Sequence, residues 1–212
     1  MKIAVFGATG MAGSAIVTEA LSRHHRVTAV SRHSSPRIEH ERLGSRRFDV
    51  ADSAALDALL SGMDAAVLTI RLAPGEESRL APLTQGFLDV AALHRTQVLV
   101  VGGASPLRSP AHPDRLLITD PDYVPAAWRT LAQASLEQFE VCSQHTYGGW
   151  VYLSPPAVLE EGERVGGYRR GATTLLTDEN GVSRITAADL AVAVVDELES
   201  PGNAQHFTVS QK

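Results

Sequence analysis

Short runs of apolar residues alternate along the chain with longer segments in which apolar residues recur at helical spacing. A short, continuous apolar run bounded by turn residues is typical of a strand that is buried on both faces. The strands predicted in this way cover residues 3–6, 26–30, 46–50, 65–69, 98–101 and 150–153.

Helical periodicity fills the segments between these strands. Helices are predicted over residues 11–23, through Leu56, Leu59 and Leu60, over about 79–94, through Trp128, Leu131, Leu136 and Phe139, and through Leu190, Val194 and Leu198. Asp52 or Ser53 can cap the second helix, and residues 186–189 form a capping box that opens the last one. Strands alternating with helices predict an α/β fold: a doubly wound parallel sheet in a three-layer α/β/α arrangement.

Two segments interrupt the alternation, each directly after a predicted strand. Residues 103–126 contain five prolines, and residues 155–171 are rich in proline and glycine. Ligands of open parallel sheets bind outside the carboxyl ends of the strands, so a pocket is expected beneath these loops. The length predicts one domain, residues 1–212, in which residues 155–212 form a small C-terminal part on the substrate side.

Three glycines follow the first predicted strand and lead into the first helix. In the segment Gly7-Ala8-Thr9-Gly10-Met11-Ala12-Gly13, the first glycine permits a tight turn. The second lets the backbone approach a pyrophosphate, and the third allows close packing of helix on strand. The N–H groups of the helix N-terminus then face the anion. The pattern predicts a Rossmann-type dinucleotide site.

The end of the second strand predicts which dinucleotide binds. An acidic residue there holds a free ribose 2′-hydroxyl, whereas an arginine accommodates a 2′-phosphate. Here Ser31 and Arg32 follow the strand and no acid is present; Arg32 can pair with the phosphate, and Ser31 or Ser34 can donate a hydrogen bond. We therefore expect NADP(H) in preference to NAD(H). Asp49 and Val50 are expected to flank the adenine.

The sequence resembles the atypical short-chain dehydrogenases with a GxxGxxG turn, the NAD(P)H-binding group that includes NADH-flavin reductase-like proteins, biliverdin reductase B and NmrA-like proteins. The resemblance extends over essentially the whole chain. Its motifs are Gly7 to Gly13, Arg32, Asp49, Gly102-Gly103-Ala104-Ser105, Ser154-Pro155-Pro156, Gly162-Glu163-Arg164 through Tyr168, and Ser183-Arg184-Ile185-Thr186 with Asp189. It implies that Thr69, Ile70 and Arg71, Gly102 to Ser105, and Ser154, Pro155 and Pro156 line the nicotinamide side of the cofactor.

The usual catalytic pair of short-chain dehydrogenases is missing. That pair is a tyrosine with a lysine four residues later, which lowers the pKa of the phenol. The chain has only Lys2 and Lys212, and Tyr123 is followed four places later by Ala127. Reduction of simple carbonyls is therefore disfavoured, whereas hydride delivery to a flavin, a quinone or another conjugated acceptor needs no strong protein acid.

The candidates for contact with the substrate are few. Ser105 can hydrogen-bond an acceptor oxygen or cap the loop that it begins. Arg71 and Tyr168 are possible substrate contacts, and His112 is a weak candidate for a proton donor. Asp189 looks catalytic in isolation, but its place in the capping box favours a structural role.

Composition narrows the choice of partners. The net charge of −5 argues against nucleic acid or an anionic membrane. The single Cys142 is expected to be a buried apolar residue in a cytoplasmic protein, and no set of His, Cys or Glu residues has metal-ligand spacing. The partner is expected to be a small molecule, and either a monomer or a homodimer is compatible with the sequence.

Two classes of function remain. The first is an NADPH-dependent reductase of a conjugated small molecule, or a related biosynthetic enzyme that uses the cofactor without net redox change. The second is a non-catalytic NADP(H) sensor of the NmrA-like type. The long loops over the predicted pocket favour the enzyme.

Overall fold

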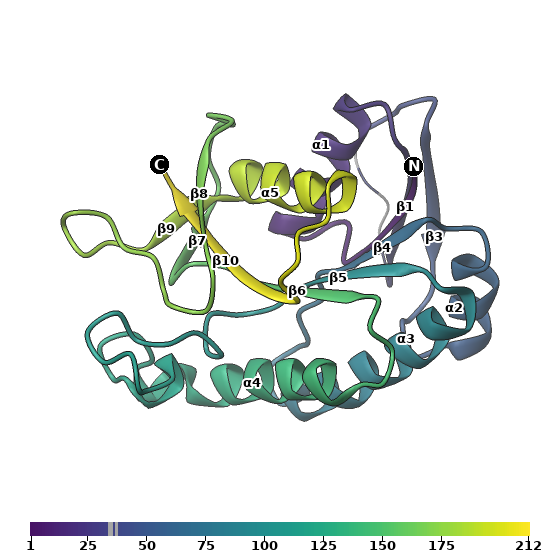
Figure 1. Ribbon diagram of the computed structural model, residues 1–212. Helices are drawn as coiled ribbons and strands as arrows, with labels where there is room; N and C mark the ends of the chain where they lie inside the picture. The colour runs from purple at the N-terminus through teal and green to yellow at the C-terminus, as the bar shows by residue number, and fades with distance from the viewer. Residues whose placement is uncertain (34–35, 37) are drawn as a thin grey trace.

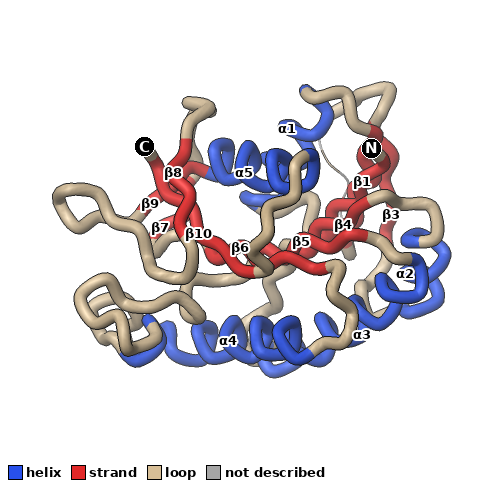
Figure 2. Tube along the Cα trace, viewed as in Figure 1, coloured by secondary structure: helices blue, strands red, loops and turns tan. Residues whose placement is uncertain are grey.

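The computed structural model describes residues 1–33, 36 and 38–212, and most of its strands form one central sheet (Figures 1 and 2). Within the described residues this sheet has eight strands in the order β3-β2-β1-β4-β5-β6-β10-β8. Their bounds are β1 Lys2–Phe6, β2 Arg26–Ser31, β3 Leu43–Arg47, β4 Ala65–Leu68, β5 Gln97–Val101, β6 Trp150–Ser154, β8 Tyr168–Gly171 and β10 His206–Gln211. All neighbours pair in parallel except β10 and β8. A separate parallel pair joins β7 (Val158–Glu160) to β9 (Arg184–Thr186).

Helices cover both faces of the sheet, as Figures 1 and 2 show. One layer holds α1 (Met11–Ser22) and α5 (Ala187–Glu199); the other holds α2 (Ser53–Leu60), α3 (Leu80–His94) and α4 (Arg129–Gln144). The 3₁₀ turns η1 (Glu77–Arg79), η2 (Leu117–Thr119) and η3 (Ala126–Trp128) lie in the connections. The predicted Rossmann-type α/β/α fold is confirmed.

Two hydrophobic clusters fill the space between the sheet and the helices, one on each face of the sheet. Alternate residues of the inner strands belong to alternate clusters: Val5 packs beneath α1 and α5, and Phe6 packs beneath α2, α3 and α4. The Phe6 ring meets that of Phe87 edge to face, with centroids 4.8 Å apart. Both faces of β1 and β4 are buried, which explains why these strands appear in the sequence as unbroken apolar runs.

Helix caps follow the prediction in part. The Asp52 side chain accepts a hydrogen bond from the N–H of Ala55 at the start of α2, and the Thr186 hydroxyl accepts one from Asp189 N–H at the start of α5. The reciprocal half of the predicted capping box is wrong, because the N–H of Thr186 donates to the Gln211 side chain instead. The Asp189 carboxylate accepts from Gly166 N–H and from Gln211. Asp189 is buried and holds together the start of α5, a loop and β10.

The third strand lies earlier than predicted. It covers Leu43–Arg47, not residues 46–50, and it is an outer strand whose residues are mostly exposed. Phe48 and Val50, which suggested the strand, follow it and pack against the α2–α3–α4 cluster. Phe48 and Val50 are therefore apolar because the segment after β3 returns to the core, not because they belong to the strand.

The C-terminal third contains strands that the sequence pattern did not predict. Residues 155–171 were expected to form a loop, but they include β7 and β8, and both β9 and β10 lie beyond them. Residues 103–126 have no strand longer than an isolated bridge and form an ordered loop with its own apolar cluster of Leu107, Leu117 and Leu175. Figure 1 shows this loop at the lower left, on the same side as the connection between β8 and β9.

Candidate cofactor and substrate site

The glycine turn after β1 is built so tightly that two of its glycines cannot be replaced. Gly7 has φ +82°, and a β-carbon on it would lie 2.1 Å from the carbonyl oxygen of Thr69. A β-carbon on Gly13 would lie 2.1 Å from the carbonyl oxygen of Gly7. The N–H groups of Gly7 and Ala8 both donate to the Val30 carbonyl. The turn is therefore packed between β2 and β4, with α1 directly on top of it.

Gly10 lies in a different environment from the other two glycines. Its φ is −77°, and the only atom near an added β-carbon would be the Gly7 carbonyl oxygen at 3.4 Å. Gly10 is the N-cap of α1, and no side chain of a described residue caps this helix, in contrast to α2 and α5. The first turn of α1 therefore presents backbone N–H groups to the open space in front of it.

That space is a cavity of about 1050 Å³ across the carboxyl ends of the parallel strands. Most of the site residues predicted from the sequence line it; Ser154, Tyr168 and His112 do not. Ser34 lies outside the described residues. The position agrees with the general rule that ligands bind where the strand order reverses, here between β1 and β4.

At the β2 end of the cavity, Ser31 and Arg32 follow the strand. Arg32 is exposed and has no hydrogen bond or ion pair with any residue that the structure describes. Asp49 and Val50 line the same end, and the Asp49 carboxylate accepts a hydrogen bond from the N–H of Ala51. Arg32 is thus a cation directed to solvent beside the glycine turn.

On the other side of the turn, Gly102 and Gly103 lie against buried polar side chains. A β-carbon on Gly102 would lie 1.8 Å from the Tyr152 hydroxyl, and one on Gly103 would lie 2.6 Å from the Ser135 hydroxyl. Tyr152 is fully buried and donates to the Ser135 carbonyl oxygen (3.1 Å). Both positions therefore require glycine, because Tyr152 and Ser135 pack directly against the backbone there.

Ser135 and Gln138 also line the cavity, and sequence reasoning missed both. They are buried residues of α4, and single polar residues within a predicted helix gave no signal of their own. The Gln138 amide donates to the Thr84 hydroxyl at 3.1 Å. A buried polar network of α3, α4 and β6 therefore supports the wall of the cavity.

Ser105 and Tyr123 both line the cavity, but their polar groups differ in availability. The Ser105 hydroxyl donates to the carbonyl oxygen of Ala132 at 2.7 Å, which fixes the loop to α4. Burial, with the negative charges of Asp120 and Asp122, raises the pKa of the Tyr123 phenol. Among the described residues no cation offsets these effects, so Tyr123 is a weaker acid than a free tyrosine.

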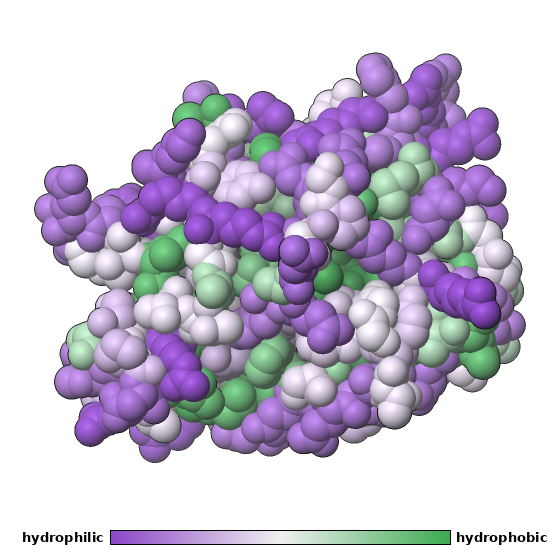
Figure 3. Space-filling view, in the orientation of Figure 1, coloured by the Kyte–Doolittle hydropathy of each residue, from purple (hydrophilic) through white to green (hydrophobic). Residues whose placement is uncertain are grey.

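Apolar side chains enclose the rest of the cavity. Trp128, Met11 and Val158 line it and remain 57%, 43% and 46% exposed, which is unusual for large apolar residues. On the face drawn in Figure 3, hydrophilic residues cover most of the periphery, and several hydrophobic ones show between the levels of α4 and β10. Trp128 was predicted only as a helix residue, yet it offers a flat apolar surface to a ligand.

The long loop that follows β5 is joined at its outer end to the connection between β8 and β9. The Arg108 N–H donates to the Thr173 carbonyl oxygen at 2.7 Å, and Leu175 N–H donates back to Arg108 at 3.0 Å. Leu175 packs on Leu107, in the apolar cluster to which Tyr123 is added. The loop that carries Ser105 and Tyr123 is therefore fastened from outside. His112, in the same loop, does not line the cavity.

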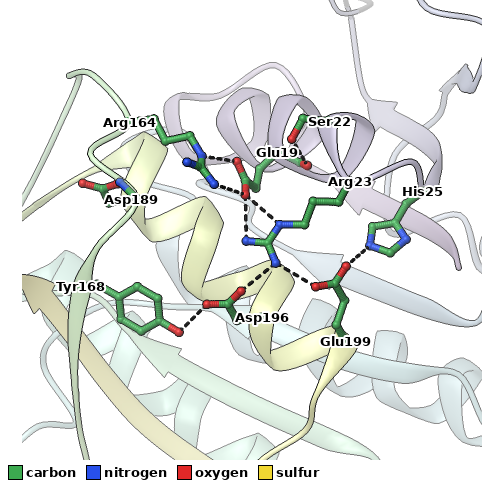
Figure 4. A network of polar contacts seen from close by, with 10 residues as sticks. Glu19, Ser22, Arg23, His25, Arg164, Tyr168, Asp189, Asp196 and Glu199 are labelled. Carbon is green, nitrogen blue, oxygen red and sulfur yellow. Dashed lines mark hydrogen bonds and ion pairs between the residues drawn. The ribbon is translucent and has the colours of Figure 1, made fainter.

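Tyr168 does not line the cavity and belongs to a network of polar side chains, which Figure 4 shows. Its hydroxyl donates to Asp196 of α5 at 2.8 Å. Asp196 also pairs with Arg23, and the buried Glu19 of α1 pairs with both Arg23 and Arg164. The Arg164 hydrogen bonds hold the pKa of Glu19 below its ordinary value, although burial opposes the shift. The network ties the segment before β8 to α1 and α5.

Ser154 also lies away from the cavity. It is fully buried, and its hydroxyl contacts Nε2 of His206 at 2.9 Å. Only the two prolines that follow it, Pro155 and Pro156, reach the cavity wall. Ser154 therefore supports the Ser-Pro-Pro segment from behind.

The doubly wound sheet, the tight glycine turn and the uncapped helix facing a large cavity define a dinucleotide-binding protein. The chain belongs to the NAD(P)H-binding family, whose model matches residues 7–201. The family resemblance stated for the sequence is thereby confirmed.

Relatives match over nearly their whole length. The "Uncharacterized protein YwnB" of Bacillus subtilis is 33% identical over 99% of this chain and 98% of its own. A solved structure from Streptococcus pneumoniae, called "a putative NADH-flavin reductase", is 30% identical, with a TM-score of 0.87 and all of both chains covered. A "putative epimerase" from Bacteroides thetaiotaomicron is 31% identical, with a TM-score of 0.90, covering 99% of this chain and 96% of that one.

Two further observations concern other kinds of site. No helix of the described residues is long and apolar enough to cross a membrane. Within the same residues, no three His, Cys, Asp or Glu side chains are grouped so that they could hold a metal ion.

Proposed function

We propose that this protein is an NADPH-dependent oxidoreductase that delivers hydride to a conjugated small molecule such as a flavin or a quinone. The observation that carries the proposal is the set of residues that line the cavity of about 1050 Å³. The cavity runs from Arg32 on one side of the glycine turn to an apolar chamber beside Trp128 on the other. One end suits a phosphorylated adenosine, and the other suits a flat apolar acceptor.

The residues around the glycine turn fit the cofactor. The open N-terminus of α1 is suited to the pyrophosphate, and the space in front of Gly10 lets that group approach the backbone. The exposed guanidinium of Arg32 is suited to a 2′-phosphate, which supports NADP(H) over NAD(H). Asp49 and Val50 would flank the adenine. When bound, the reduced nicotinamide supplies the hydride.

The acceptor end of the cavity is built for orientation, not for proton transfer. Trp128 and Val158 offer apolar surface, while Arg71 is the cation nearest in sequence to the end of β4. Tyr123 has no lysine beside it, and its raised pKa makes it a poor general acid. Reduction of a conjugated acceptor fits, because the anion that forms is delocalised and water can protonate it.

Residues 1–212 act as one dinucleotide-binding domain in this proposal, and residues 155–212 contribute the substrate side through the Ser-Pro-Pro segment. The single buried Cys142 is in keeping with a reducing, cytoplasmic location.

The Bacteroides relative called a "putative epimerase" supports a second candidate, an enzyme that retains its cofactor and performs no net oxidation. Such an enzyme would keep its dinucleotide bound through purification and through turnover.

Steady-state NADPH oxidation with riboflavin, FMN and menadione, measured under nitrogen, tests the proposal. We expect saturable turnover with at least one of them and none with simple ketones. Gly10→Val is the matched control, because it should remove cofactor binding alone. NADPH binding without turnover of any acceptor would favour the sensor, and a stoichiometric cofactor that stays bound would favour the epimerase-like enzyme.

A further inference from the structure

Four polar side chains from α3, α4 and β6 meet beside the cavity. Thr84, Ser135, Gln138 and Tyr152 are all buried, and two of them, Ser135 and Gln138, line the cavity. A buried donor without an acceptor costs free energy, so nearly every donor in such a cluster is paired. A donor that is left over therefore marks a place where a ligand can accept a hydrogen bond.

The orientation of the Gln138 amide follows from its partner Thr84. The Thr84 hydroxyl donates to the Leu80 carbonyl oxygen at 2.9 Å, which uses its only proton. Toward Gln138 the hydroxyl can only accept, so the amide nitrogen faces it, at 3.1 Å. The amide oxygen of Gln138 then faces the Tyr152 hydroxyl, at 3.3 Å.

One donor of this cluster is left over. The Tyr152 hydroxyl has the Ser135 carbonyl oxygen at 3.1 Å, and the Ser135 hydroxyl has the Tyr152 oxygen at 3.3 Å. A side-chain amide carries two N–H donors, and Gln138 uses one of them on Thr84. The other has no acceptor among the residues that the structure describes, although Gln138 is only 2% exposed. Gln138 therefore has one N–H to offer to the cavity that it lines.

The surroundings of this donor are apolar. Side chains of β1, α3 and α4 line the cavity together with Gln138, namely Phe6, Leu80, Leu83, Leu131 and Ala134. An ionised group would lose its hydration among them, whereas an apolar ring would not. A neutral N–H in such a place suits a carbonyl oxygen on a conjugated ring.

Gln138 lies at the acceptor end of the cavity. Its partner Tyr152 belongs to β6, which is separated from β1 and the glycine turn by β4 and β5. Neighbouring strands are about 4.8 Å apart, so β6 and β1 are roughly 14 Å from each other. The donor is therefore well beyond the turn that would hold the pyrophosphate.

We propose that Gln138 donates a hydrogen bond to a carbonyl oxygen of the acceptor, and that the acceptor is a quinone. The inference rests on the proposed hydride transfer. The quinone ring gains a hydride from the reduced nicotinamide, and the electron pair of a carbonyl group moves onto its oxygen, which water then protonates. The products are the hydroquinone and the oxidised cofactor. The Gln138 hydrogen bond strengthens as charge develops on that oxygen, so it lowers the barrier without transferring a proton.

Steady-state kinetics with menadione and methylene blue test this, because methylene blue is a planar acceptor that has no carbonyl oxygen. Gln138→Met keeps the length of the side chain and removes the donor. It should lower kcat/KM for menadione by about tenfold to a hundredfold and change that for methylene blue by less than about threefold. Calorimetric titration should show that the variant binds NADPH as the wild type does.

Thr96→Val is the matched control. Thr96 is just as buried, and its hydroxyl donates to the Leu60 carbonyl oxygen at 3.3 Å, but it does not line the cavity. It should lose stability and keep wild-type kinetics with both acceptors. If Gln138→Met does not fold, Gln138→Glu replaces it, because a protonated carboxyl group can still donate to Thr84 but lacks the second donor. The same selective loss is expected.

An unchanged kcat/KM for menadione in a folded Gln138 variant would overturn this inference and leave the proposed function intact. Equal losses with both acceptors would also overturn it, because Gln138 would then support the site as a whole. Turnover of flavins without turnover of menadione would overturn the assignment of a quinone. A wild type that oxidises NADPH with none of these acceptors would overturn the proposed function itself.

Discussion

The α-carbon of Gly13 lies so close to the carbonyl oxygen of Gly7 that no β-carbon fits between them. Helix α1 thereby starts directly on the turn that ends β1, and its first N–H groups stand at the mouth of the cavity. The three glycines of the motif therefore have two different roles. Gly7 and Gly13 allow the tight turn to form, and Gly10 leaves space in front of the helix for a ligand.

Gly10→Val is expected to abolish cofactor binding in a folded protein. The side chain would occupy the approach to the N-terminus of α1. The protein itself tolerates the new β-carbon, because the nearest atom, the carbonyl oxygen of Gly7, is 3.4 Å away. The loss of stability should be about 1 kcal/mol, as for a poor N-cap residue. Calorimetric titration with NADPH and thermal unfolding measure the two effects.

Gly13→Ala is the contrasting control, because it should lower the melting temperature far more than Gly10→Val. A Gly10→Val protein that is folded and binds NADPH as the wild type does would contradict the site.

Arg32→Ala should weaken NADPH binding by about 2 kcal/mol, the scale of a charge-assisted hydrogen bond to phosphate, and leave NADH nearly unchanged. The reason is that Arg32 pairs with none of the residues that the structure describes and lies at the β2 end of the cavity. Titration of both cofactors into both proteins gives the comparison. If wild type prefers NADH, or if the variant loses both cofactors equally, the assignment is wrong.

Tyr123→Phe should leave turnover within roughly tenfold of wild type, because a general acid contributes a hundredfold or more and Tyr123 is poorly suited to be one. Ser105→Ala should act through positioning, since its hydroxyl is used to hold Ala132. Stopped-flow hydride transfer to a flavin or quinone across pH is the measurement. A fall of more than about a thousandfold in Tyr123→Phe would restore carbonyl reduction.

His206 should make the protein less stable in mild acid. Burial lowers the pKa of His206 to about 4, from 6.5 in its ordinary state. Between pH 4 and pH 6.5, therefore, His206 is protonated in the unfolded chain but neutral in the folded one. The free energy of unfolding consequently rises with pH across this range. Between pH 7.5 and pH 5 this residue should account for a loss of about 2 kcal/mol.

Urea unfolding of wild type and His206→Gln at the two pH values isolates the contribution. The glutamine keeps a hydrogen-bonding group for Ser154 but does not titrate, so its stability should change less with pH. An identical pH dependence in both proteins would show that another group is responsible.

The sequence predicted those elements whose cause is local. β1 and β4 are buried on both faces, so their residues are apolar without interruption, and the glycine turn is recognisable because each glycine answers a steric need. Asp52 caps α2 through a neighbour three residues away. Almost all the predicted site residues line the cavity for the same reason, because they follow strand ends.

The missed elements depend on distant partners. β10 exists because His206 to Thr208 pair with β6, more than fifty residues earlier, and β8 pairs with β10 in turn. Tyr168 was expected near the substrate, but its position on β8 brings it to Asp196. The buried amide of Gln138 is hydrogen-bonded to Thr84 of another helix and to the hydroxyl of Tyr152. None of these contacts leaves a pattern in its own stretch of sequence.

The hydrogen bonds that join Arg108 to Thr173 and Leu175 have a consequence for protein engineering. Residues 103–126 form part of the cavity wall, but Leu175, which never touches the cavity, sets where that wall stands. A library aimed at new acceptors should therefore randomise Leu175 together with Leu107 and Tyr123. If only the residues of the wall were varied, the packing of Leu175 would still favour the original position of the loop.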